Sequence, residues 1–153
     1  MYDGIHSELT GRIIKAFYTV YNELGYGFNE SVYERSPLIE LRRAGLDAQS
    51  QFEIPVFYSG QVVGNYKADI VVNGCVLLEL KSTVGIAKEH EAQVLNYLKA
   101  TRIEVGLLFN FGPELQLKRF VLDNHRKGSL RWAQQIEVRG GDTDDTENTD
   151  LKA

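Results

Sequence analysis

The chain has 153 residues, a length typical of one domain with a substantial core. Its single cysteine, Cys75, excludes an internal disulfide and a multi-thiolate zinc site. No run approaches the roughly 18 apolar residues of a membrane span, and the N-terminus lacks a signal-peptide pattern, so we expect a cytoplasmic protein without a membrane partner.

The net charge of -4 comes from the C-terminal end of the chain. Residues 142–153 hold five acidic residues and one basic residue, and the rest of the chain holds 16 of each. Because the end has no apolar content to bury, we expect a single domain over residues 1–139 and a disordered acidic tail over 140–153. A basic stretch before the tail is a candidate phosphate-contacting surface, with a solvated strand and helix as the alternative. It contains Lys118, Arg119, Arg126, Lys127, Arg131 and Arg139.

Two helices are predicted at the start of the chain. Apolar residues recur at helical spacing over residues 5–24, and Gly25-Tyr26-Gly27 is typical of a helix end. Asn29 can cap a second helix that runs to about Arg43. Pro37 lies inside this second helix and predicts either a kink or an earlier end.

After these helices the pattern changes to strands. We predict strands over 49–58, 62–72 and 75–81, a helix over 89–100, and strands over 104–109 and 115–122. The predicted order is helix, helix, three strands, helix and two strands. This order indicates a mixed sheet flanked by helices, an α+β arrangement within the broad α/β class.

The predicted hairpin over residues 69–81 is apolar but carries three charges, Asp69, Glu79 and Lys81. Charges in a buried strand are costly unless they pair or hold a metal ion. A type I turn followed by a left-handed Gly74 would give an odd register, in which Asp69 lies opposite Glu79. We predict this register, because it places all three charges on one face and leaves the other face apolar.

Two adjacent carboxylates repel each other, and a divalent cation relieves the repulsion. Oxygen ligands favour Mg²⁺ or Mn²⁺, and such an ion activates water and stabilises charge on a phosphate. Lys81, on the same face, can orient the water or neutralise the phosphate. The pattern therefore favours a metal-dependent phosphodiesterase, and the alternative is a charge cluster on a solvated edge hairpin.

Three motifs follow one another along the chain. They are Gly27-Phe28-Asn29-Glu30-Ser31-Val32-Tyr33, Asp69 with Glu79-Leu80-Lys81, and Gln93 on the next helix. Over about residues 5–125 the chain resembles the GxxExxY proteins of the PD-(D/E)xK nuclease-like superfamily. The resemblance implies a restriction-endonuclease-like core, helix-strand-strand-strand-helix-strand, with an extra N-terminal helix. Ala68 stands where the superfamily's name has proline.

The resemblance also assigns roles to these residues. Metal ligands would be Asp69, Glu79, the backbone carbonyl of Leu80, and Glu30 directly or through water. Lys81 would act on water and phosphate, and Gln93 would steady Lys81. For Glu30 the alternative is helix capping, and for Tyr33 and Tyr97 we expect supporting roles through packing and hydroxyl hydrogen bonds.

The function that follows is a nuclease-type phosphodiesterase that acts on the backbone of DNA or RNA with Mg²⁺ or Mn²⁺. The alternative is a non-catalytic module on the same scaffold that binds nucleic acid or a protein. A homodimer or a protein partner is compatible with either, and the acidic tail offers a third route, regulation of a partner.

Overall fold

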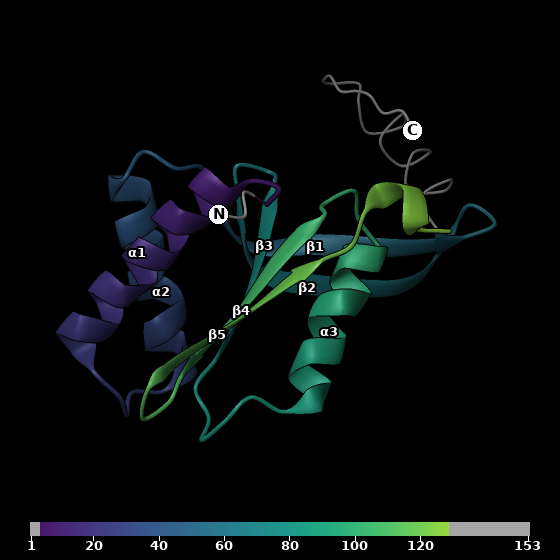
Figure 1. Ribbon diagram of the computed structural model, residues 1–153. Helices are drawn as coiled ribbons and strands as arrows, with labels where there is room; N and C mark the ends of the chain where they lie inside the picture. The colour runs from purple at the N-terminus through teal and green to yellow at the C-terminus, as the bar shows by residue number, and fades with distance from the viewer. Residues whose placement is uncertain (1–3, 129–153) are drawn as a thin grey trace.

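The structure is a computed structural model, and it describes residues 4–128. A five-stranded sheet carries helices α1 and α2 on one face and helix α3 on the other (Figure 1). The elements are α1 (Ser7–Leu24), α2 (Glu30–Arg43), β1 (Ala48–Tyr58), β2 (Gln61–Val72), β3 (Val76–Lys81), α3 (Lys88–Lys99), β4 (Val105–Phe111), β5 (Leu115–Val121) and the short 3-10 helix η1 (Asn124–Arg126).

This order confirms the predicted fold class. Elements α2, β1, β2, β3, α3 and β4 form the expected core, and α1 is the extra N-terminal helix. The expected acidic tail, 140–153, and the last part of the expected domain, 129–139, lie outside the described residues. None of the helices between residues 4 and 128 is long and apolar enough to cross a membrane.

The sheet has the strand order β1-β2-β3-β4-β5. Strands β3 and β4 run parallel, and the other neighbours are antiparallel. A parallel pair requires a crossover connection, which α3 supplies. Because helices cover both faces of β3 and β4, their sequences VLLELK and VGLLFNF are almost wholly apolar.

Aromatic stacking fixes α1 and α2 on the sheet. The Phe17 ring of α1 lies 3.8 Å from the Phe109 ring of β4, nearly parallel to it. The Tyr33 ring of α2 stacks on Phe111 at 4.3 Å. Such pairs add to the stabilisation from apolar burial. They place the start of α2 over the C-terminal end of β4.

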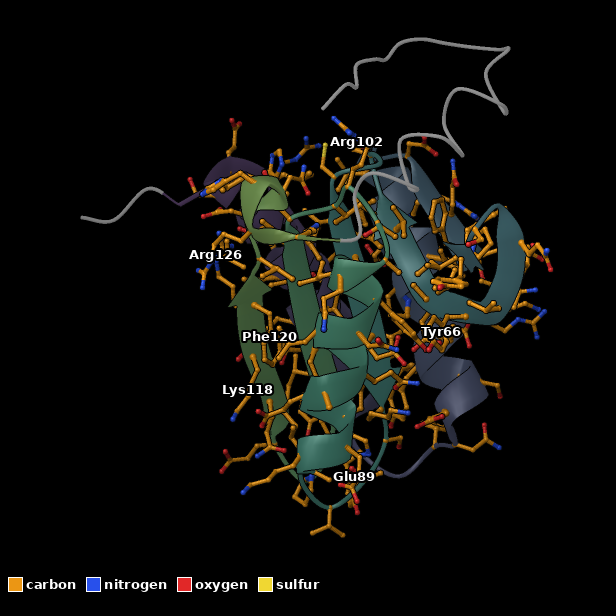
Figure 2. All side chains as sticks on the ribbon, turned by 90° about the vertical axis from the view of Figure 1, so that its right-hand side faces the viewer. Tyr66, Glu89, Arg102, Lys118, Phe120 and Arg126 are labelled. Carbon is orange, nitrogen blue, oxygen red and sulfur yellow. The ribbon has the colours of Figure 1, made fainter. Side chains whose placement is uncertain are left out.

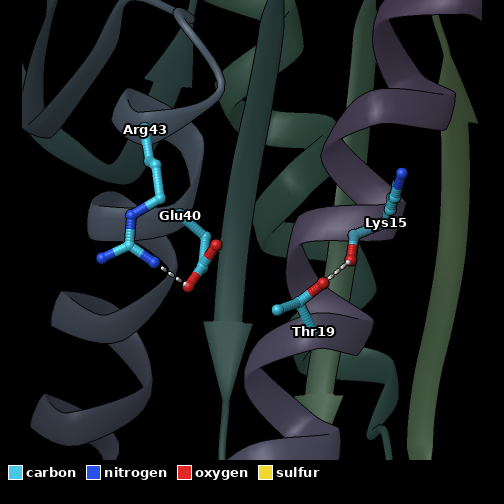
Figure 3. Close-up of polar contacts among 4 residues, drawn as sticks. All are labelled: Lys15, Thr19, Glu40 and Arg43. Atoms are coloured by element: carbon cyan, nitrogen blue, oxygen red, sulfur yellow. Dashed lines mark hydrogen bonds and ion pairs between the residues drawn. The ribbon is translucent and has the colours of Figure 1, made fainter.

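The outward face of this helix pair carries polar contacts within single helices (Figure 3). Thr19 Oγ1 donates to the Lys15 carbonyl at 2.9 Å, and Arg43 pairs with Glu40 at 3.1 Å. An exposed ion pair within one helix contributes little to stability. The docking of the two helices therefore depends on their apolar inner faces.

Helix α2 ends at Arg43, as predicted, and differs from the prediction at its N-cap. It continues through Pro37, so of the two outcomes expected there the earlier end does not occur; Pro37 is buried, and packing compensates for the lost backbone hydrogen bond. Asn29 occupies the N-cap position, but its side chain accepts a hydrogen bond from Ser31 Oγ at 2.8 Å and caps no backbone N–H.

Glycine at position 106 allows α3 to lie close to β4. A Cβ added there would come within 2.7 Å of Val94 Cγ1, so Gly106→Ala forces the helix away from the sheet. We expect it to lower the free energy of unfolding by about 1–3 kcal/mol, measured by urea denaturation. In the matched variant Gly11→Ala, nothing lies within 4 Å of the new Cβ, and a gain of up to about 1 kcal/mol from helix propensity is expected. Equal effects of the two variants would contradict this account of the packing.

Candidate active site

The hairpin between β2 and β3 has the predicted odd register. Val72 pairs with Val76, and each step along the ladder keeps that offset as far as Ile70 and Leu78. Continuing it brings Asp69 beside Glu79, where the Asp69 Oδ2 accepts a hydrogen bond from the Leu80 N–H at 2.8 Å.

The turn itself differs from the prediction. Asn73 and Gly74 both have positive φ, 54° and 65°, whereas the expected type I turn has only the glycine in the left-handed region. Asn tolerates this conformation better than most residues. The Asn73 N–H donates to the Asp47 carbonyl at 2.7 Å, and Asn73 Oδ1 accepts from the Asp47 N–H at 2.8 Å. These two bonds to the segment before β1 account for the change of turn type.

The odd register separates the two faces as predicted. One set of hairpin side chains packs with α1 and α2; it consists of Ile70, Val72, Val76, Leu78 and Leu80. Val71 and Leu77 pack with α3 on the other face. Strand alternation places Asp69, Glu79 and Lys81 on the α3 face, at the C-terminal end of β3.

Glu79 is a buried carboxylate with one oxygen that accepts no hydrogen bond within residues 4–128. Glu79 is 3% exposed, and its Oε1 has no hydrogen-bond partner among the described residues. A buried polar atom without a partner is rare in folded proteins and calls for an explanation. An oxygen atom in this state beside a second carboxylate suits a hard divalent cation.

Burial raises the pKa of both acids, and the charge of a nearby carboxylate adds to each rise, Glu34 for Asp69 and Asp69 for Glu79. Burial raises the pKa of Asp69 to about 6; the Leu80 N–H and Lys81 oppose the rise, and the charge of Glu34 adds to it. Burial raises the pKa of Glu79 to about 8, with the charge of Asp69 as the next cause and Lys81 opposing. Lys81 therefore lies close enough to act on both carboxylates.

Glu30 lies at the rim of this site. It is the first residue of α2, it is exposed, and its Oε2 accepts a hydrogen bond at 3.3 Å from the N–H of Ser82, the residue after Lys81. Across residues 4–128 no three His, Cys, Asp or Glu side chains converge closely enough to hold a metal ion. The structure thus brings Asp69 and Glu79 together and leaves Glu30 beside them, so coordination by Glu30 stays a prediction.

Tyr33 is fully buried and supports the loop that precedes Glu30. Its hydroxyl donates to the Gly25 carbonyl at 2.6 Å and accepts from the Phe28 N–H at 3.2 Å. Gly27 has a φ of 121°, which the turn between these anchors requires. The distance in sequence between Gly27 and Tyr33 therefore has a structural reason. Tyr33, the last residue of the motif, holds the loop that precedes the first turn of α2.

Gln93 and Tyr97 form the α3 wall of the site. Gln93 Nε2 donates to the Tyr97 hydroxyl at 2.9 Å, and the Tyr97 ring lies 5.5 Å from that of Tyr66, on the sheet beside α3 (Figure 2). Burial, then the charges of Glu79 and Asp69, raise the pKa of Tyr97 to about 12. No hydrogen bond joins Gln93 to Lys81 within the described residues, so Gln93 orients Tyr97.

Sequence reasoning missed two residues beside Asp69. The charge of Glu34 raises the pKa of Asp69 more than that of Glu30 does, and Glu34 accepts a hydrogen bond from Gln51 Nε2. Gln51 has a φ of 55° within β1, between the residues that pair with Ile70 and Ala68, the two neighbours of Asp69. The spacing of Glu30 and Glu34, one helical turn, could have indicated Glu34, whereas nothing in the sequence marks Gln51.

Asn110 was also missed, although it is the one polar residue of β4. It is fully buried opposite Lys81 in the parallel ladder. Its Oδ1 accepts from the Thr83 N–H at 2.9 Å, and its Nδ2 donates to the Thr83 carbonyl at 3.0 Å. A Cβ at Gly112 would lie 2.8 Å from the Thr83 carbonyl oxygen, so the lack of a side chain at Gly112 lets the backbone at Thr83 approach β4. Asn110 therefore fixes the chain immediately after Lys81.

Three residues of the basic stretch have partners within the protein, so its role as a phosphate-contacting surface stays a prediction. Lys118 pairs with Glu91 at 2.7 Å, and Arg119 donates to the Ile5 carbonyl at 2.8 Å. Lys127 is buried, and its amine donates to the Ile103 carbonyl at 2.7 Å. Lys118 and Arg126 lie on the β5 side of α3, away from Tyr66 (Figure 2). Arg131 and Arg139 lie outside the described residues.

The pKa of Glu79 predicts an unusual pH dependence of stability without metal. The folded chain holds the Glu79 proton up to about pH 8, whereas an ordinary glutamate loses it near 4.5, so stability falls as pH rises through this window. We expect the free energy of unfolding of wild type to fall by on the order of 3 kcal/mol between pH 4.5 and pH 8, and that of Glu79→Gln to lack this fall. Urea denaturation with chelator at the two pH values measures it. Glu23→Gln, at an exposed position, should keep the wild-type loss. A Glu79→Gln profile parallel to wild type would show that Glu79 ionises normally.

Comparison with known proteins agrees with this geometry. The sequence over residues 7–120 matches the family model of the PD-(D/E)XK nuclease superfamily. The fold is similar to a solved structure, "Crystal structure of SSO0001", with a TM-score of 0.51 and 16% identity over 89% of this chain and 69% of that chain. No curated protein matches the sequence. Because the family model spans most of the chain, the protein belongs to the PD-(D/E)XK nuclease superfamily.

Proposed function

We propose that the protein is a metal-dependent nuclease that hydrolyses phosphodiester bonds of DNA or RNA. One observation carries the proposal: Asp69 and the buried Glu79, whose Oε1 lacks a partner, lie side by side with Lys81 at the end of a central strand. A fold that needed only stability would gain from replacing such a pair with apolar residues.

Asp69 and Glu79 would hold Mg²⁺ or Mn²⁺, with the Leu80 backbone carbonyl and Glu30, directly or through water, as further ligands. When bound, the ion would stabilise charge on the phosphate and lower the pKa of the attacking water. Glu30 would have to leave its present partner, the N–H of Ser82 at 3.3 Å, to contribute.

Lys81 would orient the water and neutralise the phosphate. Its charge acts on both carboxylates of its own face, and Asn110 holds the chain just after it through Thr83. Gln93 would act through the Tyr97 hydroxyl on the α3 wall. The Gly27–Tyr33 motif, with Glu30 at the rim, supports placing the chain among the GxxExxY proteins of the superfamily.

The second candidate is a non-catalytic module that binds nucleic acid, a protein partner or a second copy of the chain. A specific observation favours it: residues 4–128 hold equal numbers of acidic and basic residues, whereas duplex-binding enzymes usually present a basic surface. Under this alternative the Asp69–Glu79 pair has no ligand to hold. Metal binding therefore separates the two candidates.

Lys81→Met tests the catalytic proposal directly. It should lower metal-dependent cleavage of labelled single- and double-stranded DNA and RNA on the order of 100-fold or more, because charge on the phosphate loses its partner. The matched variant Lys15→Met removes an exposed lysine from α1 and should cleave as wild type does. No cleavage by wild type of any substrate with Mg²⁺ or Mn²⁺, or full cleavage by Lys81→Met, would refute the proposal.

Thermal melting with Mn²⁺ tests the metal site without an activity assay. A ligand that binds only the folded chain stabilises it, by about 2.7 kcal/mol at 100 times its Kd, so wild type should melt at a higher temperature with Mn²⁺. Asp69→Asn and Glu79→Gln should lose this shift, and Glu23→Gln should retain it. A shift of equal size in all four proteins would place the ion elsewhere.

A further inference from the structure

The loop between α1 and α2 exposes two aromatic side chains next to the candidate active site. Tyr26 is 52% exposed and Phe28 is 49% exposed, although both belong to the short segment before Glu30. Single exposed apolar residues are common on protein surfaces. Two aromatic residues on one short loop that also carries a site residue are a more specific arrangement.

Phe28 is joined directly to the segment that follows Lys81. The Phe28 carbonyl accepts a hydrogen bond from Ser82 Oγ at 3.2 Å, and the Ser82 N–H donates to Glu30. Ser82 therefore connects the loop to the end of β3. A phosphate bound at Lys81 would place its neighbouring nucleotide within reach of this loop.

The Phe28 ring is held in place while one side of it stays open. Its backbone N–H is bound to the Tyr33 hydroxyl at 3.2 Å, and its ring meets the Tyr33 ring edge to face, with centroids 6.2 Å apart. Tyr33 is itself fixed by stacking on Phe111 at 4.3 Å. An aromatic face held this way loses little conformational entropy when a ligand stacks on it.

The overall charge of the described residues favours base contacts over a general attraction to phosphates. Residues 4–128 carry no net charge, and Lys118, Arg119 and Lys127 already have partners within the protein. Affinity for a duplex comes largely from neutralised phosphates, which this surface does not favour. Unpaired bases, in contrast, stack on exposed aromatic rings whatever their sequence.

We propose that the substrate is single-stranded nucleic acid, and that an unpaired base beside the cleaved phosphate stacks on Phe28. This inference rests on the proposed nuclease function and narrows its substrate class. Stacking on Phe28 requires that the base leave its helix, so paired duplex should bind and react more weakly.

Binding can be measured without cleavage, by fluorescence anisotropy of a short labelled oligonucleotide with chelator present. We expect Phe28→Ala to raise the Kd for single strands on the order of tenfold, the loss of one base–aromatic stack. Phe28→Leu, which keeps an apolar contact with Tyr33, should show the same loss, and Phe28→Trp should restore binding. Tyr58→Ala is the matched control, since it removes an exposed aromatic residue from the tip of the β1–β2 hairpin.

The outcomes separate the stacking proposal from the nuclease proposal. Single-strand binding that depends on Phe28, in a chain that cleaves nothing with any metal, would support stacking and refute catalysis. Cleavage by Phe28→Ala at the wild-type rate, or duplex bound as tightly as single strands, would overturn stacking and leave catalysis standing. A change within about twofold for Phe28→Leu, with melting temperature unchanged, would also overturn it.

Discussion

The burial of two adjacent carboxylates, Asp69 on β2 and Glu79 on β3, is the constraint on which the candidate site depends. Burial raises the pKa of Asp69 to about 6, and burial together with the charge of Asp69 raises that of Glu79 to about 8, so the sheet carries an electrostatic cost in the absence of a cation. That cost is tolerable because β3 and β4 are covered on both faces, and each buried Leu or Ile contributes about 1.5–3 kcal/mol. The proposed function gives this pair a use, the binding of a divalent cation.

Supporting contacts reach the site from three directions. The α2 helix brings Glu30 and Glu34, and Tyr33 anchors both the helix and the loop before it. On β4, the buried Asn110 holds the chain after Lys81. From α3, Gln93 orients the Tyr97 hydroxyl. Sites of this kind depend on neighbours that lock each functional side chain, and each neighbour here comes from a different element.

The register of the β2–β3 hairpin was predictable from its pattern of apolar and charged residues. Of the two registers, only the odd one keeps a lone charge out of an apolar face. A one-residue slip would have moved Asp69 among Leu78 and Leu80, so polarity alone selected the pairing. Turn type was not predictable in the same way, since it depends on bonds between Asn73 and Asp47, a residue far away in the sequence. The extent of α2 to about Arg43 was predictable, but the helix's passage through Pro37 was not, because packing on the sheet outweighed the local preference.

By itself the sequence determined the order of elements, the hairpin register and the acids and lysine at its end, since these follow from local periodicity and the cost of burying charge. The tertiary structure alone decided which groups face those acids. Glu34 with Gln51, the bond from Asn110 to Thr83, the contact between Ser82 and Phe28, and the internal partners of the basic stretch all join distant segments. No local pattern records them, because each depends on how separate elements pack around one sheet.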